Sequence, residues 1–213
     1  MIADYHVQVV KARVRGRKRI RHAAKPFDRG RGWVFAEALG PPRLWTQALD
    51  EALVCFTASA DNELHASGVS LASCVTRVRE HLTERGARYL GANPLNVGLA
   101  AFHIGQDSLD TVTSGGGRVY FHDNGLPARI SQRGREDVGL LGGRSVSASG
   151  EYSPGGLIFA GSDSLFSDAT IRTVGKALQS PPVESCAALA SLLGDHPVDD
   201  AGAIVLTLRL ETI

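Results

Sequence analysis

PGGLIFAGSDSLFSD, residues 154–168, is the stretch around which the rest of the chain can be interpreted. Proline and two glycines form a turn, and the Leu, Ile, Phe and Ala that follow make an apolar run too short for an independent helix. The sequence therefore predicts a strand buried on both faces. A polar corner follows, with Asp163 just beyond the last apolar residues and Ser167 or Asp168 able to cap the next helix. A carboxylate at such a corner is a good position for a metal ligand.

Length and composition favour one soluble domain. Of the 213 residues 43% are hydrophobic, which suffices for a sizeable core in a single domain spanning residues 1–213. The net charge of +1 gives no overall attraction to nucleic acid or to a membrane surface. Three widely spaced cysteines, an odd number, indicate a reducing compartment rather than a disulfide framework or a zinc site. The N-terminus lacks a signal-peptide pattern and no apolar run approaches the roughly 18 residues of a membrane span, so we expect a cytoplasmic protein.

Basic residues are concentrated near the N-terminus, where ten of the 23 lysines and arginines lie within the first 31 positions. One interpretation is a solvated strand edge and loop. The other is an anion site for a phosphorylated partner, with Arg19 and Arg21 among its contacts, because guanidinium groups match phosphate oxygens in geometry and charge. No aromatic residues interleave with these charges, which makes nucleic acid a less suitable partner.

The rest of the chain alternates between helical and strand patterns. Apolar residues at helical spacing predict an antiparallel helix pair over residues 44–56 and 67–90. The three strands between residues 97 and 122 are expected to form a meander, and residues 129–150 a loop or flap. Two further helices, separated by a Ser-Pro-Pro break at 180–182, precede the last strand. The predicted strands cover residues 5–14, 32–40, 97–104, 108–113, 118–122, 157–160 and 201–210.

A turn of three consecutive glycines, residues 115–117, lies inside the predicted meander. One interpretation is a tight hairpin that needs positive φ angles, which glycine adopts without strain. The other is a set of free backbone amides that cradle an anion. The pattern leaves both open.

Three segments resemble, in the same order, landmarks of the PPM/PP2C family of metal-dependent Ser/Thr protein phosphatases. Arg118 matches the Arg of the family's Gly-Asp-Ser-Arg turn, and the resemblance makes it a candidate phosphate contact. Residues 154–168 are similar to the family's Pro-Gly-Asp, apolar strand and Ser-Asp-Gly-Leu segment, whose Asp holds a metal ion and corresponds to Asp163. The Asp pair before the terminal strand resembles the last landmark, with Asp199 as the metal-binding residue and Asp200 as a further candidate.

The resemblance implies an α+β fold, namely a four-layer αββα sandwich of two antiparallel sheets flanked by helix pairs. The short chain is similar to the minimal bacterial branch of the family, the SpoIIE-like and stressosome feedback phosphatases, which implies a role in bacterial signalling. Members of the family use two Mn or Mg ions, bridged by one Asp, to generate the hydroxide that attacks a phosphoserine or phosphothreonine ester.

The same alignment places apolar residues at two metal positions. Aligned on the glycine that ends the strand, the family's bridging Asp is Leu39 here, and a leucine side chain has no lone pair for a hard cation. The Arg-x-x-Asn-Glu-Asp signature falls on residues 19–24, where Ala23 and Ala24 replace the acidic pair. Glu37, two residues before Leu39 on the same face of the strand, is an alternative source of one oxygen.

Three functions are compatible with this pattern. The first is a pseudophosphatase that binds a phosphoprotein, a kinase or a related phosphatase without turnover, with Asp163 and Asp199 holding at most one weakly bound Mn or Mg ion. The second is a divergent phosphoserine or phosphothreonine phosphatase in which Glu37 or Asp28 replaces the missing ligands. The third is a structural scaffold subunit with no anion site.

Overall fold

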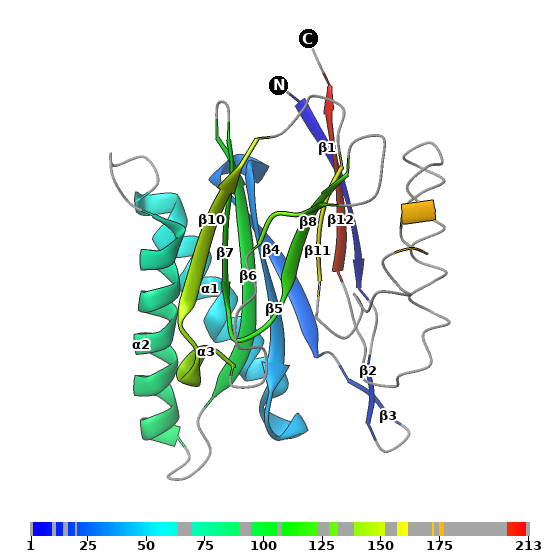
Figure 1. The fold of residues 1–213 in the computed structure, drawn as a ribbon. Helices are drawn as coiled ribbons and strands as arrows, with labels where there is room; N and C mark the ends of the chain where they lie inside the picture. Colours follow the sequence, from blue (N-terminus) through cyan, green and yellow to red (C-terminus); the bar gives the residue numbers. More distant parts are fainter. Residues whose placement is uncertain are drawn as a thin grey trace.

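Two sheets lie face to face, and helices α1 and α2 cover the outer face of the first sheet (Figure 1). This computed structural model describes residues 2–9, 12–14, 17–19, 21–63, 70–89, 95–105, 108–122, 128–131, 139–151, 157–161, 172, 175–176 and 204–211.

The first sheet has five strands in the order β10-β7-β6-β5-β4, and all its pairings are antiparallel. Its strands are β4 (His22–Phe27), β5 (Gly32–Leu39), β6 (Asn96–Ile104), β7 (Leu109–Ser114) and β10 (Ser145–Gly150). Strand β5 is therefore flanked on both sides, which explains why its sequence GWVFAEAL is almost wholly buried.

The second sheet contains β11-β8-β9 and the antiparallel pair β1-β12, and β12 runs alongside β11 (Figure 1). Its strands are β1 (Ile2–Val9), β8 (Arg118–His122), β9 (Ala128–Arg129), β11 (Leu157–Gly161) and β12 (Ile204–Glu211). A separate short hairpin joins β2 (Ala12–Val14) to β3 (Arg17–Arg19). The first and last described strands are thus neighbours in space.

Helices α1 (Trp45–Glu63) and α2 (Leu71–Tyr89) are amphipathic and pack against each other and against the first sheet. Short helical turns lie at η1 (Asp28–Gly30), η2 (Pro42–Leu44) and α3 (Gly139–Gly142). The turn η2 leads directly into α1, so the end of β5 is only five residues from the start of the long helix. This short connection brings strand end and helix start together.

Alternation along β5 divides the interior into two cores. Val34, Ala36 and Ala38 face α1 and α2, whereas Trp33 and Phe35 face the second sheet. The core between the sheets also contains the following buried side chains: Phe102, Ile104, Leu109, Val119, Phe121, Ile158 and Ala160. Residues beyond Phe35 on the same face of β5 consequently point towards the edge of the space between the sheets.

The predicted sandwich of two antiparallel sheets is confirmed, as are the strand at residues 157–160 and the first helix pair. The predicted second helix pair lies outside the described residues, apart from isolated helical positions at 172 and 175–176. No helix within the described part of the chain is both long and apolar enough to cross a membrane.

Two predictions about the middle of the chain are wrong. Strand β8 does not continue a meander with β7, because it pairs with β9 and β11 in the other sheet. The segment expected to be a loop contains α3 and the edge strand β10, which pairs with β7. The sequence of β10, SVSASG, carries few apolar residues because β10 is the edge strand of this sheet among the described residues and its side chains are partly or fully exposed.

Candidate functional site

The candidate site lies at the C-terminal end of β5, where the resemblance places the bridging carboxylate. Strand β5 ends with Glu37, Ala38 and Leu39, and Glu37 and Leu39 share the face that points between the sheets. The antiparallel register of β4 sets His22 directly opposite Glu37, and the Ala38 amide donates to the carbonyl of Arg21 at 2.7 Å. Two cationic or potentially cationic side chains therefore flank the strand end.

Arg21 is bound to three groups at this point. Its Nε donates to the carbonyl oxygen of Ala38 at 3.2 Å, and Nη2 lies 3.3 Å from Oε1 of Glu37. The guanidinium carbon lies 5.5 Å from the centre of the Trp45 ring, within the range of a cation–π contact. Trp45 in turn donates from Nε1 to the carbonyl of Gly40 at 3.0 Å. The arginine thus joins the start of β4, the end of β5 and the start of α1.

His22 is the second partner of Glu37. Its side chain is fully buried, its Nε2 lies 3.4 Å from Glu37 Oε1, and its ring stacks on Phe35 with centroids 5.9 Å apart. Neither ring nitrogen has a hydrogen-bond partner among the described residues. Glu37 is therefore enclosed between a guanidinium and an imidazole, with 15% of its side chain exposed.

Leu39, the residue at the expected bridging position, packs against the turn of α3. A Cβ added to Gly139 would lie 2.6 Å from Cδ1 of Leu39 and 2.4 Å from Nδ2 of Asn96, so both side chains lie against this glycine. Asn96 also accepts a hydrogen bond from the Leu141 amide at 3.2 Å. An apolar contact thus occupies the place where the resemblance expects a metal ligand.

The turn of α3 is held by Arg79 of helix α2. Arg79 donates from Nε to the Leu140 carbonyl at 2.9 Å and from Nη2 to the Gly143 carbonyl at 2.7 Å, with Oγ of Ser114 at 3.5 Å. These bonds satisfy carbonyl groups at the end of a helical turn that has no continuation. The sequence gives no local signal for this contact, because the partners are more than 60 residues apart.

The triple-glycine turn serves close packing of two backbones. Residues Gly115, Gly116 and Gly117 have φ angles of 66°, 135° and 87°, and Gly115 and Gly117 are buried. A Cβ at Gly115 would lie only 1.9 Å from the carbonyl carbon of Gly139. This geometry supports the tight-hairpin interpretation, because a buried turn pressed against another backbone does not offer an open cradle to an anion.

The alanines assigned to the acidic signature do not lie beside Leu39. Ala23 pairs with Ala36 and Ala24 with Phe35, which is three to four residues deeper along β5. At about 3.3 Å per residue, that places them roughly 10–13 Å from the strand end. The register instead brings Arg21 and His22 to this position.

The other predicted site residues lie in several separate parts of the sequence. Asp163, Asp199 and Asp200 lie outside the described residues. Arg19 ends the β2-β3 hairpin. Arg118 begins β8, opposite Gly161, and donates to the hydroxyl of Tyr120 at 3.3 Å.

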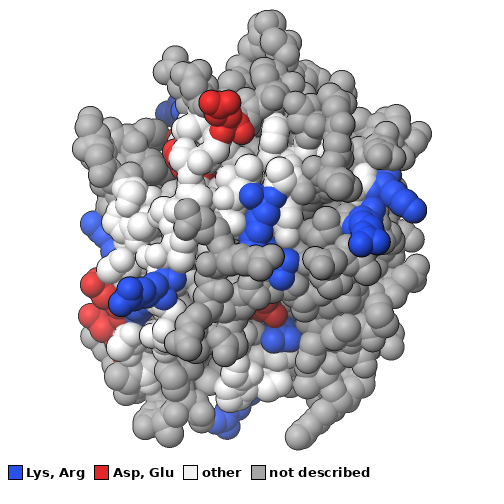
Figure 2. Space-filling view, viewed as in Figure 1, with Lys and Arg blue, Asp and Glu red and all other residues white. Residues whose placement is uncertain are grey.

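Arg118 is also separated from Arg21 by the sheet. Val119 and Phe121 of β8 point into the core between the sheets, so Arg118 and Tyr120 project from the opposite face. In the space-filling view, which has the orientation of Figure 1, the described lysines and arginines are scattered, with acidic side chains among them (Figure 2). The described cations on this face therefore do not form one continuous basic patch.

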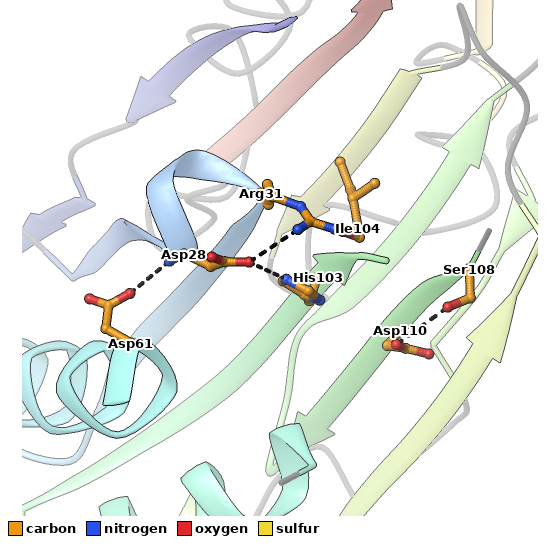
Figure 3. A network of polar contacts seen from close by, with 7 residues as sticks. All are labelled: Asp28, Arg31, Asp61, His103, Ile104, Ser108 and Asp110. Atoms are coloured by element: carbon orange, nitrogen blue, oxygen red, sulfur yellow. Dashed lines mark hydrogen bonds and ion pairs between the residues drawn. The ribbon is translucent and has the colours of Figure 1, made fainter. Parts of the chain in front are cut away.

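Asp28 is part of a separate polar network (Figure 3). Its Oδ2 lies 2.7 Å from Nε2 of His103 and 3.9 Å from Nη1 of Arg31, and its amide donates to Oδ1 of Asp61 at 2.7 Å. Arg31 also donates to the carbonyl of Ile104 at 3.0 Å. These contacts tie the β4-β5 turn to α1 and β6, and Asp28 has a positive φ of 45°.

Asp28 cannot replace a ligand at Leu39. The network precedes Gly32, the first residue of β5, whereas Leu39 is the last. Seven residue steps of about 3.3 Å separate the two ends of the strand by roughly 23 Å, and no single ion spans that distance.

The described residues at the end of β5 do not fit a divalent ion. Leu39 offers no ligand atom, and the carboxylate of Glu37 is already paired with Arg21 and lies against His22. Within the described part of the chain, no group of three or more His, Cys, Asp or Glu side chains is arranged to hold a metal. Hard cations such as Mn and Mg require several oxygen ligands, which this strand end does not supply.

Comparison with solved structures identifies the class of fold. The chain is similar to the serine/threonine phosphatase PstP/Ppp of Mycobacterium tuberculosis, at 17% identity and a TM-score of 0.81 over 100% of both chains. It is also similar to the catalytic domain of PstP in complex with two manganese ions, at 18% identity and a TM-score of 0.72 over 97% of both chains. A third similar structure is PppA of Pseudomonas aeruginosa, described as a key regulatory component of T6SS, at 14% identity and a TM-score of 0.76 over 99% of both chains.

The fold is therefore that of the PPM/PP2C Ser/Thr phosphatases, as the sequence resemblance predicts. Neither a protein-family model nor a curated protein matches the sequence. At 17% identity or so the likeness establishes the fold, and function has to be argued from the site.

Proposed function

We propose that residues 1–213 form one PP2C-like domain that acts as a pseudophosphatase in bacterial cytoplasmic signalling. In this role it binds a phosphoprotein, a kinase or a related phosphatase without hydrolysing a phosphoester. The observation that carries the proposal is the chemistry of the strand end, where Leu39 packs against Gly139 and Glu37 pairs with Arg21 beside the buried His22.

The absence of a carboxylate at Leu39 limits how strongly a metal ion can bind. Asp163 and Asp199, with Asp200 nearby in the sequence, are the carboxylates retained from the family's pattern. Without a bridging carboxylate they would hold at most one Mn or Mg ion, weakly, because a hard cation needs more oxygen ligands than two side chains provide. A pair of ions that activates water between them is then not formed.

Anion contacts of the proposed partner site would come from Arg19 and Arg118, since Arg21 is engaged by Glu37 and Trp45. Two similar structures support a role in regulation by their descriptions. PppA is described as a key regulatory component of T6SS. The description of another similar structure names the bacterial stressosome, a modular system adapted to control secondary messenger signalling.

Calorimetric titration of Mn into the metal-free protein tests the loss of catalysis, with Asp163→Ala as the control. A phosphatase assay at saturating Mn follows, with a phosphoserine peptide and p-nitrophenyl phosphate as substrates. We expect one weak ion or none, and no turnover. Binding of two ions together with hydrolysis that Asp163→Ala abolishes would contradict the proposal and establish a divergent phosphatase.

Binding of a phosphoserine peptide, compared with its unphosphorylated form, tests the anion site. We expect the phosphorylated peptide to bind more tightly, and Arg19→Glu combined with Arg118→Glu to remove the difference. If charge reversal leaves binding unchanged, the domain is a structural scaffold rather than a phosphoprotein reader.

A further inference from the structure

Arg21 makes an unusual set of contacts for a residue at a strand end. One guanidinium donates to a main-chain carbonyl of β5, pairs with the carboxylate of Glu37 and lies over the ring of Trp45. The Arg21 and Glu37 side chains are 19% and 15% exposed, so the pair is largely shielded from water. Charge pairs in such surroundings are only weakly screened.

We infer that Arg21 is a built-in cation that neutralises Glu37 and closes this carboxylate to a divalent metal ion. The inference deepens the proposed function and rests on it, because both concern the same strand end. Solved structures of this fold include one with two manganese ions. In this chain the guanidinium of Arg21, the residue before β4, places a positive charge beside Glu37 at the end of β5.

Arginine is suited to this task for physical reasons. The guanidinium stays charged at any accessible pH, so its positive charge faces Glu37 throughout that range. Its planar fork directs Nε and Nη2 to two different acceptors, the Ala38 carbonyl and the Glu37 carboxylate, while its flat face stacks on Trp45. A lysine carries a single ammonium group and cannot make these contacts together.

The contacts of Arg21 also join three parts of the fold. Arg21 directly precedes β4, Glu37 lies in β5 and Trp45 begins α1, so the guanidinium links the start of β4 to β5 and α1 at one point. Removing one member of a shielded pair leaves the other charge uncompensated, whereas removing both does not. The double substitution should therefore destabilise the protein less than the two single substitutions together.

A double-mutant cycle measures the coupling between the Arg21 and Glu37 side chains. We expect Arg21→Gln and Glu37→Gln each to raise the unfolding equilibrium constant at least tenfold. In the double variant we expect an effect at least fivefold smaller than the product of the two single effects. Arg43→Gln, at an exposed arginine in the neighbouring turn η2, is the matched control and should change the constant less than threefold.

Independent, multiplicative effects of the two substitutions would overturn the inference. If Arg21→Gln does not fold, a folded double variant supports the pairing of Arg21 with Glu37, and an unfolded double variant overturns the inference. Arg21→Lys separates charge from geometry, because it keeps the charge but should recover only part of the lost stability.

Manganese calorimetry tests the closure of Glu37 to metal. Leu39→Asp alone introduces a second carboxylate on the same face of β5 as Glu37 while Arg21 stays in place, and we expect it to bind Mn at least tenfold more weakly than the combined Arg21→Gln and Leu39→Asp variant. Equal affinities, or no binding by either variant, would overturn the inference. Activity of the unmodified protein is measured separately, so a failure here is distinct from a failure of the proposed function.

Discussion

Substitution of Gly115 by alanine tests how closely the glycine turn packs against the turn of α3. Gly115 has a φ of +66°, and an added Cβ would lie 1.9 Å from the carbonyl carbon of Gly139. Real Cβ atoms essentially never approach another atom within 3.0 Å, so the two backbones would have to separate by more than 1 Å. The turn of α3 that carries Gly139 would move with them.

The expected cost has two parts. A left-handed backbone costs a non-glycine residue about 1 kcal/mol. Forcing atoms into a closely packed region costs roughly 1–3 kcal/mol more. We therefore expect Gly115→Ala to lower the free energy of unfolding by about 3 kcal/mol, measured by urea denaturation monitored by circular dichroism.

Gly40→Ala is a matched control for the backbone part. Gly40 has a φ of +79°, but a Cβ there would have no atom within 4 Å. This variant should lose only about 1 kcal/mol, all from the backbone angle. Equal destabilisation by the two substitutions would refute the close approach between the turns.

Two further predictions concern side chains away from the strand end. Arg79→Gln should destabilise the protein by about 2 kcal/mol in the same urea assay, because the charged hydrogen bonds to the Leu140 and Gly143 carbonyls are lost; an effect no larger than that of the exposed control Arg144→Gln would contradict this. Burial raises the pKa of the Cys55 thiol, so its labelling by iodoacetamide should be slower than that of a free thiol at neutral pH and should accelerate as the pH rises; mass spectrometry of the labelled peptide measures the rate, and labelling as fast as a model thiol would exclude the burial effect.

Buried strands such as β5 and the first helix pair are predictable from the sequence because their patterns are local. Strand β5 is a continuous apolar run, and α1 and α2 repeat apolar residues every three to four positions. Strand β10 is not predictable in this way, because a polar edge strand has no local apolar pattern. The neighbours of β8 are not predictable either, because the three glycines permit a turn without specifying which sheet the next strand joins.

At the candidate site, too, some features are visible in the sequence and others depend on the tertiary structure. The apolar character of Leu39 is visible in the sequence, and so is the absence of a ligand atom there. The engagement of Glu37 by Arg21 and His22 depends on the register of β4 against β5, which sets residues 15 to 16 positions apart side by side. The alignment of the acidic signature with Ala23 and Ala24 does not anticipate that pairing.

Local periodicity was enough to predict most of the buried strands and the first helix pair, and the family resemblance indicated that Leu39 stands where a carboxylate is expected. Which side chain fills that place depended on contacts between β4, β5, α1 and α3, elements that meet only in the folded protein. The physical reason is that secondary structure follows from interactions between residues near each other in sequence, whereas the charge balance of Glu37 comes from strand register and helix packing.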